Sequence, residues 1–349
     1  MKNSIWLGKK EIRKQSSDFY FIAEIGTNYV EVAEMENKHP LEIAIQMVRT
    51  AAKAGVDAVK FQIYNADGLA SKEETPGQYE YLQKHHVLTF SDYDILQVTC
   101  KQEKIEFMAT LFTDEAIERF GSELNIFKIA SPDITNKQML MKISDFEKPI
   151  ILSTAGATIP EIEEALNWIS HDEVVLMHCS GTYPTEKKDI NLAMIKNMNN
   201  FFPNVIGYSD HVKPETLQFG SSPVYAFLAG ANVIEKHFTL NRTLLNNDHV
   251  HSYSPMFLSQ CIESLKEAQE ILGCYHKKPT ESENAFRLLA RRSLAVNRSI
   301  DKGEKLTFSD IITLRPGTGI PPFQIESVVG KSAKKQIDKN SILYYNLIE

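Results

Sequence analysis

Short apolar runs alternate along the chain with longer segments whose apolar residues recur at three- and four-residue spacing. Each run is rich in β-branched or aromatic residues and ends in polar or small ones, which is typical of buried parallel strands. The eight runs are YFIAEIG (20–26), AVKFQIY (58–64), EFMATLF (106–112), IFKIAS (126–131), PIILSTA (149–155), VVLMHCSG (174–181), NVIGYSD (204–210) and NVIEKHF (232–238). The helix-like segments include 40–55, 91–103, 158–170 and 257–273. Eight alternations predict an α/β fold of the (β/α)8 (TIM) barrel type.

An open doubly wound sheet is the alternative architecture for such an alternation. The count of eight, and the lack of a Gly-x-Gly-x-x-Gly motif after the first run, favour the barrel. Residues 65–90 are too long for an ordinary strand-to-helix loop, so we expect this segment to be functional or to act as a lid. Ser91 and Gly273 are the expected start and stop signals of the helices beside them.

The pattern changes after Gly273. Residues 274–284 are expected to be a linker, and short strands punctuated by Gly and Pro predict a small β-rich domain over 285–349. The barrel domain is accordingly assigned to residues 1–273. From residue 283 onward there are eleven Lys and Arg against seven Asp and Glu, whereas the whole chain has a net charge of -7. A basic small domain on an acidic barrel suggests docking between such parts.

Composition narrows the class of protein. An acidic chain without basic blocks argues against a nucleic-acid partner. No apolar run approaches the roughly 20 residues of a membrane helix, and the first twenty residues lack the apolar core of a signal peptide. Four scattered cysteines without a CxxC pair favour reduced thiols. We therefore expect a cytoplasmic protein that does not associate with membranes.

The carboxyl ends of the strands in a parallel barrel surround one mouth, so polar residues there are expected to form one site. Lys60 and Lys128 stand inside apolar runs. Either lysine alone could extend its ammonium group to solvent. Together with the hydroxyls of Thr110, Ser131 and Ser153, they predict a cradle for a phosphate or a carboxylate.

His211 and His237 follow the last two predicted strands, which are neighbours in a barrel. With carboxylates nearby at Glu24, Asp210 and Glu235, the two imidazoles could bind a divalent ion that keeps open positions for water. The alternative is an ordinary pair of hydrogen-bonding histidines.

Other residues near these runs receive simpler interpretations. Strand alternation places Lys236 on the face opposite His237, pointing outward. His85 is expected at the surface of the long segment, whereas His249 and His251 could reach the mouth. Cys179 is expected to be a small packing residue rather than a nucleophile.

Several of these stretches occur together in one known family. FIAEIGTN, AGVDAVKFQ, FMATLF, FKIASPDITN, KPIILSTAGAT, HCSGTYPT, IGYSDHV, VIEKHFTL and NDHVHS closely resemble the nonulosonic acid synthases, which make sialic, legionaminic and pseudaminic acids. ARRSLAVNRSIDKGEKLT and LRPGTGI resemble the antifreeze-like (SAF) domain that follows the barrel in that family. The resemblance runs in the expected order from about residue 20 to the C-terminus.

The resemblance implies condensation of phosphoenolpyruvate with an N-acetylated hexosamine, either N-acetylmannosamine or a 2,4-diacetamido-6-deoxyhexose, to a nine-carbon 2-keto acid and phosphate. It implies Mn2+, or alternatively Mg2+ or Co2+, bound by His211 and His237. The implied catalytic residues are Glu24, Glu235, His211 and His237. The implied phosphoenolpyruvate-binding residues are Lys60, Thr110, Lys128, Ser131, Ser153, Ser180 and Ser209. The implied sugar-binding residues are Gln62, Asp133, Tyr183, Asp248 and Arg315, the last from the SAF domain of the other subunit in a domain-swapped homodimer.

Departures from the family pattern fall mostly on the sugar side. Tyr29 stands in a longer first loop, Asp133 replaces a glutamate found in several relatives, and Gly181 replaces an asparagine found in some. Two alternatives stay open. One is another condensation of phosphoenolpyruvate with an aldose, giving an eight- or seven-carbon keto acid. The other is a barrel that binds these ligands without catalysis.

Overall fold

The computed structural model describes residues 3–217, 220–245, 248–274 and 276–349. The chain divides into two compact units, Met1–Cys274 and Tyr275–Glu349. Among the described residues, every helix is too short or too polar to cross a membrane.

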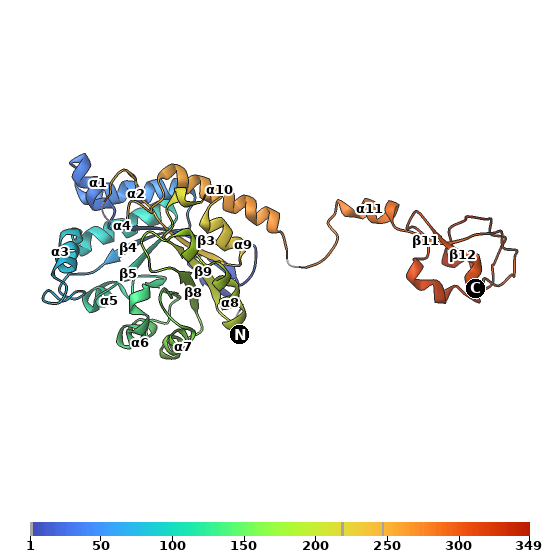
Figure 1. Cartoon of the computed structure of the whole chain (residues 1–349), viewed down its shortest axis with the longest axis horizontal. Coiled ribbons are helices and arrows are strands. Elements are labelled where there is room, and N and C mark those ends of the chain that lie inside the picture. The colour runs from blue at the N-terminus through green and yellow to red at the C-terminus, as the bar shows by residue number, and fades with distance from the viewer. Residues whose placement is uncertain (1–2, 218–219, 246–247, 275) are drawn as a thin grey trace. The chain divides into compact units, whose positions relative to one another are not determined.

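Eight parallel strands of the first unit, within its described residues, close into a barrel in the order β10-β3-β4-β5-β6-β7-β8-β9 (Figure 1). The closure excludes the doubly wound alternative and confirms the predicted barrel. The strands are β3 (Tyr20–Gly26), β4 (Ala58–Ile63), β5 (Glu106–Leu111), β6 (Phe127–Ile129), β7 (Ile150–Ser153), β8 (Val174–Cys179), β9 (Val205–Asp210) and β10 (Val233–His237).

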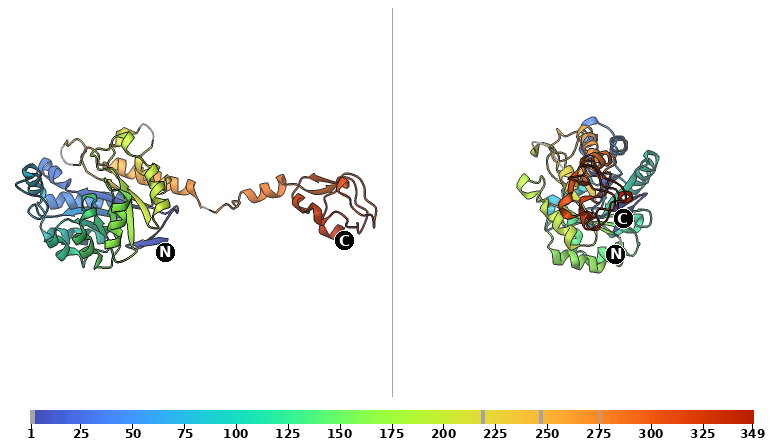
Figure 2. Two further views of the ribbon diagram at one scale, coloured as in Figure 1. Left: turned by 60° about the horizontal axis from the view of Figure 1, so that its bottom comes forward. Right: turned by 90° about the vertical axis from the view of Figure 1, so that its right-hand side faces the viewer.

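Helices surround these strands on the outside, as the views in Figures 1 and 2 agree. They are α1 (Tyr29–Glu36), α2 (Pro40–Ala54), α3 (Pro76–His85), α4 (Phe90–Glu103), α5 (Asp114–Phe120), α6 (Lys137–Ser144), α7 (Ile159–Trp168), α8 (Ala193–Phe201), α9 (Ser222–Leu228) and α10 (Pro255–Leu272).

Of the two helix signals predicted from the sequence, the stop is confirmed. Gly273 ends α10 and has a positive φ of 63°. The predicted start at Ser91 is wrong, because Thr89 caps α4 through a reciprocal capping box with Asp92.

Strand alternation divides the core into two layers. Residues such as Ile22, Met108 and Val175 point into the barrel, whereas Phe21, Phe61 and Leu176 pack under the helices. Sequence reasoning missed the hairpin of β1 (Ser4–Leu7) and β2 (Lys10–Arg13). Its apolar residues Ile5, Leu7 and Ile12 join the inward-facing cluster. The barrel interior is therefore a packed core.

The long segment 65–90 folds against the barrel. Tyr79 and Leu82 of α3 cluster with Tyr64 and Ala66. The expectation that His85 lies at the surface is wrong, since only 3% of this residue is exposed and its ring contacts Glu31 of α1. Tyr29 is also fully buried, close to Phe61, so its ring does not reach the mouth.

The second unit has its own small core, formed by residues such as Leu294, Val296 and Ile300. It contains α11 (Glu283–Ala290) and an antiparallel pair, β11 (Ser293–Val296) and β12 (Ile311–Leu314). Isolated bridges and short 3-10 turns make up much of the remainder. The helix was not anticipated, because its sequence directly follows the polar stretch that reads as a linker.

Candidate active site

A cavity of about 340 Å³ opens at the carboxyl ends of the barrel strands. Most of the residues expected at the mouth line it together, although they come from different strands. The lining residues expected from the sequence are Glu24, Lys60, Gln62, Thr110, Lys128, Ser131, Ser153, Tyr183, Ser209, His211, Glu235, His237 and Asp248. Ser180 and Asp133 are not among the lining residues, and Arg315 is an exposed residue of the second unit.

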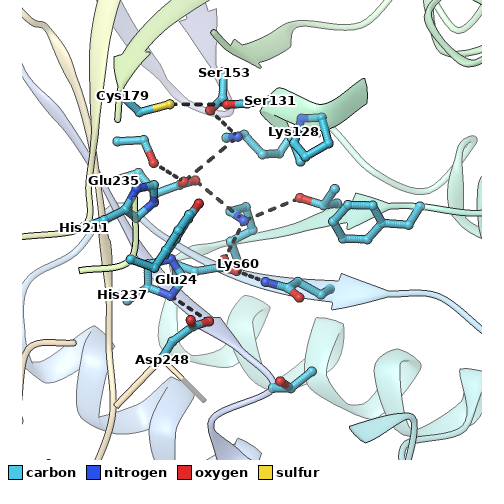
Figure 3. A pocket seen from close by; sticks show the side chains of 18 of the residues that line it. Glu24, Lys60, Lys128, Ser131, Ser153, Cys179, His211, Glu235, His237 and Asp248 are labelled. Carbon is cyan, nitrogen blue, oxygen red and sulfur yellow. Dashed lines mark hydrogen bonds and ion pairs between the residues drawn. The ribbon is translucent and has the colours of Figure 1, made fainter. Parts of the chain in front are cut away.

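Two lysines and two glutamates form the charged centre of this cavity (Figure 3). Lys60 Nζ lies 2.7 Å from Glu24 Oε2 and 3.8 Å from Glu235 Oε2. Lys128 Nζ lies 4.0 Å from Glu235 Oε1. All four side chains are buried, and Glu235 Oε2 has no hydrogen-bond donor among the described residues. Buried charges of this kind persist only because they compensate one another.

The two glutamates have opposite pKa shifts. Burial raises the pKa of Glu24 against the opposing effect of Lys60. Burial acts in the same direction on Glu235, but the attraction of Lys128 and Lys60 outweighs it and lowers the pKa. Two carboxylates whose pKa values are pushed apart can take different roles in proton transfer. Lys60 has a raised pKa because Glu235 and Glu24 outweigh burial, whereas burial lowers the pKa of Lys128.

Hydroxyl groups surround the two ammonium groups. Lys128 Nζ donates to Ser153 Oγ at 2.7 Å, and Lys60 Nζ donates to Thr110 Oγ1 at 3.4 Å. Ser209 Oγ donates to Glu235 Oε1 at 2.9 Å. Ser131 Oγ lies 3.3 Å from the sulfur of Cys179, which also lines the cavity. Burial raises the pKa of the Cys179 thiol, so this residue is poorly suited to be a nucleophile. Ammonium groups among hydroxyl donors suit an anionic ligand.

Imidazoles gather on one side of the cavity. His237 Nδ1 lies 3.3 Å from Asp248 Oδ2, and His251 Nε2 lies 3.5 Å from Asp248 Oδ1. The ring centroid of His211 is 5.4 Å from that of His237 and 5.9 Å from that of His251. His211 Nδ1 donates to Ser180 O at 2.8 Å, which leaves Nε2 available.

These residues fit a divalent metal. One potential ligand atom from each of His237, Asp248 and His251 lies within 4.8 Å of the others. His237 Nδ1 and His251 Nε2 are buried, and neither atom has a hydrogen-bond partner within the part of the chain that the structure describes. Burial lowers the pKa of His211 to about 4 and that of His251 to about 2, so both rings are neutral at pH 7, as metal ligation requires. The predicted pair of histidines thus becomes a larger cluster, and the Asp-x-x-His spacing from Asp248 to His251 was the available signal.

Lys236 and Asp210 lie on the outer face of their strands. Lys236 lies on the outer face of its strand, as expected. Its side chain is nevertheless fully buried, and its Nζ lies 2.6 Å from Asp210 Oδ2. Asp210 Oδ1 accepts from Tyr208 and Ser222. These contacts direct the Asp210 carboxylate away from the imidazoles, so it is not available as a metal ligand.

A wall of mainly aromatic and apolar side chains faces the charged centre. Sequence reasoning did not single out its members, which are Tyr64, Tyr81, Leu82 and Phe112. Tyr183 packs against His211 with tilted rings, whose centroids are 4.0 Å apart. Gln62 Nε2 donates to Glu24 Oε1 at 2.9 Å. Gly26 is required beside this bond, because its φ is +54° and an added Cβ would lie 3.2 Å from both partners.

A closed parallel barrel with a polar cavity at the carboxyl ends of its strands defines the TIM-barrel class of enzymes. Comparison with known proteins then gives the family. Residues 47–277 match the NeuB family and residues 291–349 match the SAF domain. The chain belongs to the NeuB family.

Individual relatives cover nearly the whole chain. The N,N'-diacetyllegionaminic acid synthase of Legionella pneumophila is 33% identical over 358 residues, which span 97% of this chain and 96% of that protein. The enzyme of the same name from Campylobacter jejuni is 31% identical over 92% of this chain and 98% of its own length. The crystal structure of N-acetylneuraminic acid (sialic acid) synthetase from Leptospira borgpetersenii superposes with a TM-score of 0.72 and 29% identity, covering 82% of this chain and 95% of that chain.

Proposed function

We propose that the protein condenses phosphoenolpyruvate with an N-acetylated hexosamine to a nine-carbon 2-keto acid and phosphate, with a divalent metal. The observation that carries the proposal is the pairing of two buried lysines with two glutamates, beside a cluster of neutral imidazoles, in one cavity. Relatives named as synthases of legionaminic and sialic acids support the same reaction.

Phosphoenolpyruvate carries a phosphate and a carboxylate, and these anionic groups require fixed cations. Lys60 and Lys128 would supply the cations, and the hydroxyls of Thr110, Ser131 and Ser153 would donate to the remaining oxygens. Ser209 would complete the cradle. A bound anion would take the place of part of the glutamate contact with each lysine. It would also raise the pKa values of Glu24 and Glu235, which favours proton transfer.

A metal would be held by His211, His237 and His251, with Asp248 beside them. Imidazole and carboxylate ligands suit Mn2+, with Mg2+ and Co2+ as alternatives. Such an ion acts as a Lewis acid on a carbonyl oxygen when it is bound.

The residues of the chain account for the remaining steps. The C2–C3 π electrons of phosphoenolpyruvate form the bond from C3 to the aldehyde carbon, the aldehyde oxygen takes up a proton and becomes a hydroxyl, and positive character develops at C2. Glu24 is placed to stabilise that charge. Glu235 would orient water and take its proton as the oxygen bonds to C2. Cleavage of the bond between C2 and the phosphate oxygen then releases phosphate and leaves the keto group.

The acceptor would lie between the charged centre and the wall of Tyr64, Tyr81, Leu82 and Phe112. Gln62, Tyr183 and Asp248 offer polar contacts there. Apolar and aromatic side chains suit acetamido methyls and a 6-deoxy carbon. This wall, and the two relatives named N,N'-diacetyllegionaminic acid synthase, favour a 2,4-diacetamido-6-deoxyhexose over N-acetylmannosamine.

Arg315 would complete the sugar site from the SAF domain of a second copy in a homodimer. A mixing experiment tests this part of the proposal. The variants His237→Ala and Arg315→Ala, each inactive alone, should recover activity when unfolded and refolded together. No recovery, with mixed dimers present, would remove Arg315 from the site.

The reaction itself is tested with metal-stripped protein, phosphoenolpyruvate and each hexosamine, with and without Mn2+. Metal-dependent phosphate release matched by a nine-carbon product mass is the expected result. Turnover with a phosphorylated pentose or tetrose instead would identify an eight- or seven-carbon synthase. Binding of phosphoenolpyruvate without turnover of any aldose would identify a barrel that binds its ligands without catalysis.

A further inference from the structure

Glu31 on α1 joins two elements that are distant in sequence. Its side chain is buried, and its two oxygens face two imidazoles. Oε1 lies 2.7 Å from Nε2 of His85, the last residue of α3, and Oε2 lies 3.5 Å from Nε2 of His249. His249 directly follows Asp248. One carboxylate therefore connects α1, α3 and the segment 248–253.

The hydrogen bonds of His85 define its charge. Its Nε2 faces the Glu31 carboxylate, and its Nδ1 lies 2.6 Å from the carbonyl oxygen of Tyr81. Both partners only accept hydrogen bonds, so both ring nitrogens carry protons and the ring is positive. The Glu31–His85 contact is thus an ion pair shielded from water, in which each charge compensates the other.

A second set of bonds from the start of α1 reaches the same segment. Asn28 Nδ2 donates to Phe238 O at 3.0 Å and to Ser252 Oγ at 3.1 Å. Ser252 Oγ donates in turn to Asp248 O at 2.7 Å. Asp248 and His251 belong to the imidazole cluster, so α1 fixes the backbone that carries them.

The two elements held by Glu31 contribute to the acceptor side of the cavity. The helix α3 supplies Tyr81 and Leu82 to the wall, and the segment after residue 247 supplies Asp248. Lys60 and Lys128 stand on barrel strands and do not depend on α3. We infer that Glu31 and His85 are positioning residues for the acceptor sugar: their ion pair fixes α3 over the sugar side of the site and leaves the phosphoenolpyruvate cradle unaffected. This inference rests on the proposed function.

The test compares Michaelis constants for the two substrates in Glu31→Gln, in His85→Leu and in the double variant. The KM for the hexosamine should rise about tenfold or more in each single variant, while the KM for phosphoenolpyruvate stays within about twofold. The double variant should be no worse than Glu31→Gln alone, because removal of the Glu31 charge already breaks the ion pair with His85. Glu34→Gln is a matched control, since Glu34 and Lys84 form an exposed ion pair at 3.3 Å between the same two helices. This control should change neither constant by more than about twofold.

A second readout separates this inference from the reaction. Amide hydrogen exchange over residues 76–85 should be faster in Glu31→Gln and His85→Leu than in the parent, and unchanged in Glu34→Gln. If the parent protein turns over no hexosamine, the proposed function fails, and exchange still decides whether the ion pair fixes α3. Unchanged exchange, or equal increases in both Michaelis constants, would overturn the inference. If Glu31→Gln does not fold, His85→Leu alone carries the test.

Discussion

Lys236 Nζ lies 2.6 Å from Asp210 Oδ2, and neither side chain is exposed to solvent. The same ammonium group donates to the carbonyl oxygen of Val212 at 2.5 Å. Asp210 and Val212 flank His211, so Lys236 fixes the backbone on both sides of that histidine. A run of Glu-Lys-His at the end of a buried strand is thereby explained. Glu235 and His237 face the cavity, and Lys236 stabilises the neighbouring strand end from the outer face.

Replacing Lys236 with methionine is expected to lower the free energy of unfolding by about 3–5 kcal/mol, because Asp210 would stay buried without its cation. Urea unfolding at pH 7 measures the effect. Lys266→Met is the matched control, since Lys266 forms an exposed ion pair with Glu263 at 2.7 Å, and its loss should cost less than about 1 kcal/mol. Equal effects in the two variants would contradict the role of burial.

Lys128→Met is expected to weaken phosphoenolpyruvate binding by about tenfold to a hundredfold. A hydrogen bond to a charged group contributes about 1.5–3 kcal/mol, and 1.4 kcal/mol corresponds to a factor of ten. Titration calorimetry without the sugar measures this change. The exposed Lys137 on α6 supplies the control Lys137→Met, which should bind as the parent does. Unchanged binding in Lys128→Met would remove this lysine from the cradle.

His251→Ala is expected to weaken Mn2+ binding by tenfold or more, as is His237→Ala. Electron paramagnetic resonance of free Mn2+ during titration gives the affinities. Stripping the metal with a chelator should abolish phosphate release, and added Mn2+ should restore it. His39→Ala, at the exposed start of α2, is the control. Loss of affinity in His237→Ala alone would restrict the metal site to the two histidines expected from the sequence.

The ion pair of Glu31 and His85 should make stability depend on pH. Burial alone would lower the pKa of His85, but the hydrogen bonds to Glu31 and Tyr81 outweigh it and raise the pKa above the ordinary value of about 6.5. Stability from a raised pKa is fully present below pH 6.5 and is lost as pH rises through the folded-state pKa. The pKa of Glu31 is lowered, although burial opposes the shift, so its contribution is lost only in strong acid.

Urea unfolding of the parent and of His85→Leu at several pH values between 5 and 9 checks this prediction. The parent's advantage in free energy should be largest near pH 5–6 and should shrink toward pH 9. An advantage that grows with pH would show that His85 is neutral in the folded protein.

The sequence by itself determined the barrel, because a strand buried on both faces leaves a continuous apolar run that can be read locally. It also determined most of the charged centre. Lys60 and Lys128 are conspicuous inside such runs, and parallel strands must bring their carboxyl ends to one mouth. The helix α4 shows the limit of local reading, because its start depends on which hydroxyl makes the cap.

Only the tertiary structure decided how burial and pairing act on single side chains. Strand alternation gives the face on which Lys236 lies, but the burial of that face depends on the helices packed over it. His85 pairs with a carboxylate 54 positions away, and His251 joins His237 through a return of the chain after β10. No local pattern encodes such contacts, because the free energy of a buried charge depends on partners that only the folded chain brings within reach.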